Sequence, residues 1–162
     1  MEKHVVAVQA AVTAVAAYIS AKLGILGPLL VVLLSVMVLD YFTGLLASKK
    51  EGAEYPDDPE YGWSSKKGAQ GIIKKVGYMC MIAVAIVLDY IIVTAAKGIG
   101  IGVPPATAIF ALLVTVWYIL NELLSITENA GRMGAPIPDW IRKYIAALKQ
   151  KIDSKAEEET PE

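Results

Sequence analysis

The sequence predicts an all-α integral membrane protein with three to four transmembrane helices and a C-terminal amphipathic helix at the membrane surface. Composition is the first observation behind this fold class. The chain has 162 residues, of which 56% are hydrophobic and 19% are charged, whereas soluble domains average about 45–50% apolar and about 25% charged residues. The second observation is that the apolar residues are gathered into long blocks, without the period of an amphipathic helix or strand.

Three of the apolar blocks have the length of a membrane span. A helix needs about 20 residues to cross about 30 Å of hydrocarbon. Residues 26–48, 76–96 and 103–125 meet this length and are rich in Leu, Ile and Val. We therefore predict that each of these three blocks crosses the membrane, within a transmembrane domain of residues 1–130.

A fourth, N-terminal block covers residues 5–21 and is less apolar than the others, because it consists largely of Ala and Val with several polar residues. Small residues recur in it at four-residue spacing, as in Ala7/Ala11 and Ala10/Ala14, a pattern that lets helix backbones approach closely in lipid. The block either spans the membrane, lies on its surface, or is removed as a signal peptide. The number of spans is therefore three or four.

Lysine and arginine placement predicts the orientation, because these residues are retained on the cytoplasmic side of short loops. The loop at 49–75 is rich in lysine, whereas the connection at 97–103 holds only Lys97. We place residues 49–75 and the segment 131–162 in the cytoplasm. Six basic side chains in these two parts are expected to face anionic lipid headgroups or to act as ordinary topology anchors. They are Lys66, Lys67, Lys74, Lys75, Arg142 and Lys143.

The cytoplasmic C-terminal segment contains a predicted amphipathic helix and an acidic tail. Gly131 and Gly134 end the last span, and Asp139 is placed to cap a new helix. The apolar and basic residues of that helix fall on different faces, which indicates a helix lying in the membrane interface or packing against a partner helix. The tail from Lys155 is too polar to pack and is expected to be disordered.

Several polar residues interrupt the predicted spans. An aspartate deep in a span costs about 2.5–3.5 kcal/mol, so Asp40 and Asp89 should face a partner or water. Their different depths argue against a direct pair between them. The end of the last span carries a polar stripe. The stripe consists of Asn121, Glu122, Ser125, Glu128 and Asn129. These residues are expected either to join helices or to line a wetted path once subunits assemble.

Other classes of function have no support in the sequence. The net charge of −1 argues against a nucleic-acid-binding protein. One cysteine and one histidine provide neither an internal disulfide nor a metal site. No catalytic constellation and no cofactor motif is present, so we do not expect an enzyme.

Three ordered motifs carry a resemblance to a known family. They are Asp40-Tyr-Phe-Thr43-Gly44, then Ser64-Ser-Lys-Lys-Gly68-x-x-Gly71-Ile-x-Lys-Lys75, then Asn121-Glu122-x-x-Ser125-Ile-x-Glu128-Asn129 followed by Gly134-x-Pro136-Ile-Pro138. Together they resemble the phage-lysis and toxin-secretion holin family. The match covers roughly residues 28 to 145.

The resemblance implies a homo-oligomer in the bacterial inner membrane that forms lesions at a set time. These lesions give an endolysin access to the cell wall or export a toxin, so endolysin, secreted toxin and a regulatory antiholin are the implied partners. The polar residues of the spans would first bond between helices in small clusters and later face a water-filled lesion. An antiholin of the same architecture, a small ion-coupled transporter or channel subunit, and a structural membrane anchor are the competing functions.

Overall fold

The fold consists of long α-helices, with no strand in the part of the chain that is described. The computed structural model describes residues 6, 13, 24–58, 61–102 and 108–158. Its elements are α2 (Leu26–Glu54), α3 (Ser65–Gly98), α4 (Ile109–Arg132) and α5 (Asp139–Glu158). The N-terminal block at 5–21 lies outside the described residues, except for Val6 and Thr13, which are helical.

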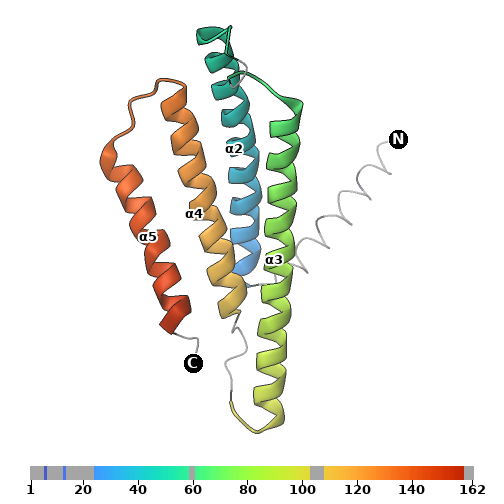
Figure 1. The fold of residues 1–162 in the computed structure, drawn as a ribbon. Helices are drawn as coiled ribbons and strands as arrows, with labels where there is room; N and C mark the ends of the chain where they lie inside the picture. Colours follow the sequence, from blue (N-terminus) through green and yellow to red (C-terminus); the bar gives the residue numbers. More distant parts are fainter. Residues whose placement is uncertain (1–5, 7–12, 14–23, 59–60, 103–107, 159–162) are drawn as a thin grey trace.

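Helix α4 is the centre of the bundle. It packs along α2 and α3, whereas α2 and α3 contact each other much less, and α5 packs on another side of α4 (Figure 1). The larger core cluster joins all three long helices through Leu33 and Met37, Tyr78 and Ile82, and Ile119. The outward faces of α2 and α3 expose large apolar side chains, which is the arrangement expected when lipid is the surrounding solvent.

Three helices, α2, α3 and α4, are long and apolar enough to cross a membrane. The described part of the chain therefore has the predicted all-helical architecture, with three helices able to span a membrane. The helices extend beyond the predicted spans, because α2 continues through Glu54 and α3 begins at Ser65. Most of the segment at 49–75 is thus helix, and the connection between α2 and α3 is short. The positions at which the spans enter and leave the bilayer stay a prediction.

The C-terminal helix α5 begins at Asp139, but it does not lie across the end of the bundle. It runs back along α4 in the opposite direction (Figure 1), so it adopts the helix-packing alternative to the predicted interfacial position. Trp117 Nε1 donates a hydrogen bond to Asp153 Oδ1 at 2.7 Å, and Lys149 Nζ lies 4.3 Å from the centre of the Trp117 ring. The helix also continues through Glu158, so the first residues of the predicted disordered tail are helical.

Asp89 joins α3 to the N-terminus of α4. Its carboxylate accepts hydrogen bonds from the backbone N–H groups of Phe110 at 3.0 Å and Ala111 at 2.8 Å. These are donors in the first turn of α4 that have no partner within the helix, and no local side chain caps it. A buried carboxylate on a neighbouring helix thus supplies the N-terminal cap and meets the positive end of the α4 dipole.

Replacing this carboxylate should destabilise the hairpin of α3 and α4. We expect Asp89→Ala to lower the free energy of unfolding by about 1–2 kcal/mol, because the N–H groups of Phe110 and Ala111 lose their acceptor. Denaturant titration of the purified protein in mild detergent micelles would measure this change. Leu88→Ala, at an exposed position on the same helix, is the matched control. Equal stability of the two variants would contradict the capping role.

Candidate functional site: a polar network at one end of the bundle

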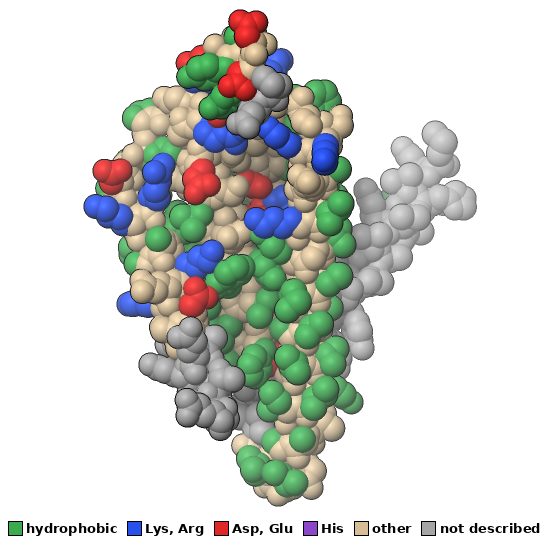
Figure 2. All heavy atoms as spheres, in the orientation of Figure 1, with side chains coloured by type: hydrophobic (Ala, Val, Ile, Leu, Met, Phe, Trp, Pro, Cys, Tyr) green, Lys and Arg blue, Asp and Glu red, His purple; other side chains and the backbone are tan. Residues whose placement is uncertain are grey.

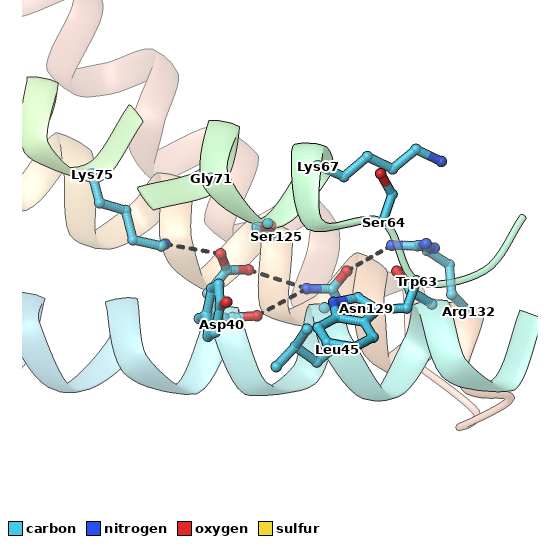
Figure 3. A pocket seen from close by; sticks show the side chains of 14 residues that line it. Asp40, Leu45, Trp63, Ser64, Lys67, Gly71, Lys75, Ser125, Asn129 and Arg132 are labelled. Atoms are coloured by element: carbon cyan, nitrogen blue, oxygen red, sulfur yellow. Dashed lines mark hydrogen bonds and ion pairs between the residues drawn. The ribbon is translucent and has the colours of Figure 1, made fainter. Parts of the chain in front are cut away.

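Residues from three distant segments of the chain meet around a cavity of about 260 Å³ between α2, α3 and α4. Figure 3 shows side chains from all three helices pointing toward this space. Its lining includes residues of each of the three sequence motifs. Those residues are Asp40, Tyr41, Gly44, Ser64, Lys67, Gly68, Gly71, Lys75, Ser125 and Asn129. Motifs far apart in sequence therefore form one structural unit.

Lys75 is the cation at the centre of the network. Its Nζ donates to Asp40 Oδ2 at 2.9 Å and also pairs with the carboxylate of Glu122. The side chains of Lys75 and Asp40 are 16% and 15% exposed, and that of Glu122 is 3% exposed. One ammonium group thus lies between two largely buried carboxylates and ties α3 to both α2 and α4. Removing one partner of such a pair leaves an uncompensated buried charge.

Asn129 extends the network to a second ion pair. Its Nδ2 donates to Asp40 Oδ1 at 3.1 Å and to Thr43 Oγ1 at 3.2 Å, and its Oδ1 accepts from Arg132 Nη1 at 3.0 Å. Arg132 also donates to both carboxylate oxygens of Glu51, at 2.8 and 2.6 Å. The dashed lines in Figure 3 follow this path from Lys75 through Asp40 and Asn129 to Arg132. Amide and guanidinium groups thus satisfy the buried acceptors on α2.

Close approach of α2 and α4 at this level depends on Gly44. A Cβ atom added at Gly44 would lie 3.5 Å from Asn129 Nδ2. An alanine would therefore fit, but a larger side chain would displace the asparagine amide from Asp40. The position of Asn129 in the third motif therefore explains why the first motif has a small residue at position 44.

The residues of the predicted polar stripe do not all face the same part of the structure. Glu122, Ser125 and Asn129 face the network and its cavity. Asn121 points elsewhere, donating to Tyr78 Oη at 2.7 Å and accepting from Lys149 Nζ at 3.1 Å. Glu128 is exposed. Asp89 is at the far end of the bundle, so Asp40 and Asp89 do not pair, as predicted from their depths.

Of the six basic residues predicted to face lipid headgroups, five are exposed and one points into the bundle. Lys66, Lys67, Lys74, Arg142 and Lys143 are exposed, and Figure 2 shows basic side chains gathered toward the end of the molecule where α2 and α3 are joined. Lys75 differs from its prediction, because it points inward and pairs with the two acids. An intramembrane acid needs a counter-ion, and the nearest cation on the neighbouring helix supplies it.

Arg132 and Glu51 were missed by the sequence reasoning. Both lie at the ends of their helices, where charged residues are usually solvated, so neither stands out in the sequence. The pairing of Lys75 had a usable signal: it is the last lysine before an apolar block, and Asp40 is the nearest buried charge on the preceding block.

The network lies at one edge of the apolar zone. Lys75 and Lys97 flank the apolar residues 76–96 of α3, a helical length of about 32 Å, which matches the hydrocarbon thickness. Aromatic residues cluster just inside this edge, where Tyr78 stacks on Tyr118 with ring centroids 3.9 Å apart. Trp and Tyr are enriched at membrane interfaces, so this cluster indicates the same boundary.

Comparison with known proteins gives a consistent result. A family model described as "Bacteriophage holin family" matches residues 17–150. An uncharacterized protein of Halalkalibacterium halodurans is 38% identical over 121 residues, covering 75% of this chain and 78% of that protein. Uncharacterized proteins of Listeria monocytogenes and Clostridium perfringens are 33% identical over 120 residues and 30% identical over 126 residues. These matches cover 74% and 78% of this chain, and 71% and 78% of the respective relatives. No solved structure matches the chain at a significant level.

Removal of the central cation should destabilise the bundle strongly. We expect Lys75→Met to cost about 3–5 kcal/mol of folding free energy, because Asp40 and Glu122 would then face each other without a counter-charge. Folding in lipid nanodiscs or detergent, followed by heat or denaturant, measures the loss.

The neighbouring Lys74→Met is the matched control, since Lys74 is exposed. The triple variant Lys75→Met/Asp40→Asn/Glu122→Gln tests the cause, because it removes all three charges together and should recover much of the stability. A similar loss in Lys74→Met, or no recovery in the triple variant, would contradict the proposed charge balance.

Proposed function

The chain belongs to the bacteriophage holin family, and from this premise we propose that it permeabilises the bacterial cytoplasmic membrane at a set time. In this proposal the chains assemble into homo-oligomers and open lesions. The lesions let an endolysin reach the cell wall or let a toxin leave the cell. Family membership over residues 17–150 is the observation that carries the proposal.

The chemistry of the bundle supports such a role. A protein that forms lesions must first be inserted in lipid without permeabilising the membrane, and must later present polar groups to water. Here the carboxylates of Asp40 and Glu122 are paired with Lys75 inside one chain, so the monomer offers lipid an apolar surface. The same groups are available to face water if the helices move apart.

In the proposed mechanism these polar groups bond between helices of one chain before the chains assemble. The partners of Asp40, Glu122 and Asn129 lie within one chain. We propose that assembly changes these contacts from within a chain to the wall of a lesion. The cost of separating a paired lysine from two acids would then oppose premature opening.

The proposed location and orientation follow from charge and relatives. The lysine-rich ends of α2 and α3 are placed on the cytoplasmic side by the positive-inside rule, and the turn between α4 and α5 at residues 133–138 lies on the same side. The relatives named above occur in bacteria. We therefore propose a multi-pass protein of the bacterial cytoplasmic membrane with a cytoplasmic C-terminus.

Induced expression in a bacterium tests the function directly. Culture turbidity and membrane potential are followed together, with and without a cytoplasmic endolysin that lacks its own export signal. We expect abrupt depolarisation after a reproducible delay, with lysis only when the endolysin is present. Gradual ion leakage at verified membrane abundance would favour a channel or transporter instead, and no depolarisation would favour an antiholin or a membrane anchor.

Weakening the network should advance the time of depolarisation. Asp40→Asn removes one of the two charges paired with Lys75, so less free energy is needed to separate the helices. We expect earlier depolarisation than in the parent at equal membrane abundance, measured with a potential-sensitive dye. Glu128→Gln removes an exposed carboxylate of α4 and serves as the control with unchanged timing. Unchanged or delayed depolarisation in Asp40→Asn would contradict the mechanism.

A further inference from the structure

An apolar groove of about 360 Å³ lies between α2 and α3, and most of its lining belongs to the predicted spans 26–48 and 76–96. Each helix contributes four residues at positions i, i+3, i+4 and i+7, so each presents one continuous face. The lining residues are Leu34, Met37, Val38 and Tyr41 of α2 and Ile72, Lys75, Val76 and Met79 of α3. The groove exists because both helices pack on α4 and hardly on each other.

We propose that the chain's own N-terminal segment, residues 5–21, fills this groove as a fourth membrane-spanning helix. The proposal concerns how the bundle is completed and does not depend on lesion formation. It selects one of the alternatives that the sequence leaves open for this segment, namely a span in place of a surface helix or a removed signal peptide.

The described residues just before α2 suit a tight turn after a preceding helix. Gly24 adopts a left-handed backbone conformation with φ +53°, which is the usual conformation of the residue that follows a helix end. Helix α2 begins only two residues later, at Leu26. Short connections between helices produce antiparallel neighbours. We therefore expect the preceding segment to run back along α2.

The register of such a hairpin matches the groove. The four groove residues of α2 lie 10, 13, 14 and 17 residues after Gly24, and alanines lie at the same four separations before it. These alanines are Ala14, Ala11, Ala10 and Ala7. They also follow the i, i+3, i+4, i+7 pattern, so they would form one face of a helix. Small side chains would thus oppose the large residues Leu34, Met37, Val38 and Tyr41.

Size and chemistry favour this occupant. Helix association in lipid is driven by close packing, and small residues permit it. The groove walls are large and exposed, with Val38 at 57% and Val76 at 58%, so a slender alanine face fits between them. The two described residues of the segment, Val6 and Thr13, are helical.

Disulfide cross-linking in native membranes tests the proposal. Cys80 is the chain's only cysteine, so Cys80→Ser provides a clean background for the full chain. In that background we expect Ala10→Cys/Val38→Cys to form a disulfide within one chain on mild oxidation. The matched control is Ala10→Cys/Leu39→Cys, because Leu39 is at nearly the same height but outside the groove lining. The control should give much less cross-linking.

Each other outcome overturns the proposal. A disulfide that joins two chains would assign the groove to a second copy. Free reaction of both cysteines with a maleimide, without a disulfide, would assign it to lipid. Intact-protein mass spectrometry that finds residues 5–21 missing would show cleavage. Equal cross-linking at Val38 and Leu39 would show a mobile segment with no docking site.

As a second measurement, Ala10→Leu should reduce the yield of the disulfide between Ala11→Cys and Met79→Cys, because a larger side chain would hold the segment away from the groove. An unchanged yield would contradict docking.

Discussion

A single lysine between two buried carboxylates constrains the structure. Lys75 lies on α3, Asp40 on α2 and Glu122 on α4, so the three helices can carry these charges inside the bundle only in one relative register. If one helix slid along the others, a charge would be left unpaired at the edge of the hydrocarbon. Separating an ion pair there costs free energy. The packing of the apolar core is held to the same register, because Leu33, Tyr78 and Ile119 lie on the same helices.

The central position of α4 explains how a small bundle can hold a charged network and still suit lipid. It contributes buried polar groups toward α2 and α3, pairs its outer side with α5, and receives its N-terminal cap from Asp89. Polar contacts of α2 and α3 are therefore directed inward, and their outer faces are left apolar. This asymmetry places the charged groups in the interior of the bundle and apolar side chains on its surface.

The sequence predicts the helices well and their contacts only partly. Apolar blocks of sufficient length have few alternatives to a spanning helix, so the three long helices could be anticipated, and the conflicting depths of Asp40 and Asp89 correctly excluded a pair. The inward direction of Lys75, the ion pair of Arg132 with Glu51, and the cap formed by Asp89 depend on which helices become neighbours. The lengthwise docking of α5 likewise depends on Trp117 and Asp153 being at matching heights, which periodicity does not reveal.

The most direct test is a distance measurement by solid-state NMR in lipid bilayers. The protein would carry ¹⁵N at the lysine Nζ and ¹³C at the aspartate and glutamate carboxyl groups, and dipolar dephasing would report pairs in direct contact. The account predicts a strong short-range signal that is largely lost in Lys75→Met and retained in Lys74→Met. The same signal in the parent and in Lys75→Met would contradict the claim that Lys75 joins Asp40 and Glu122.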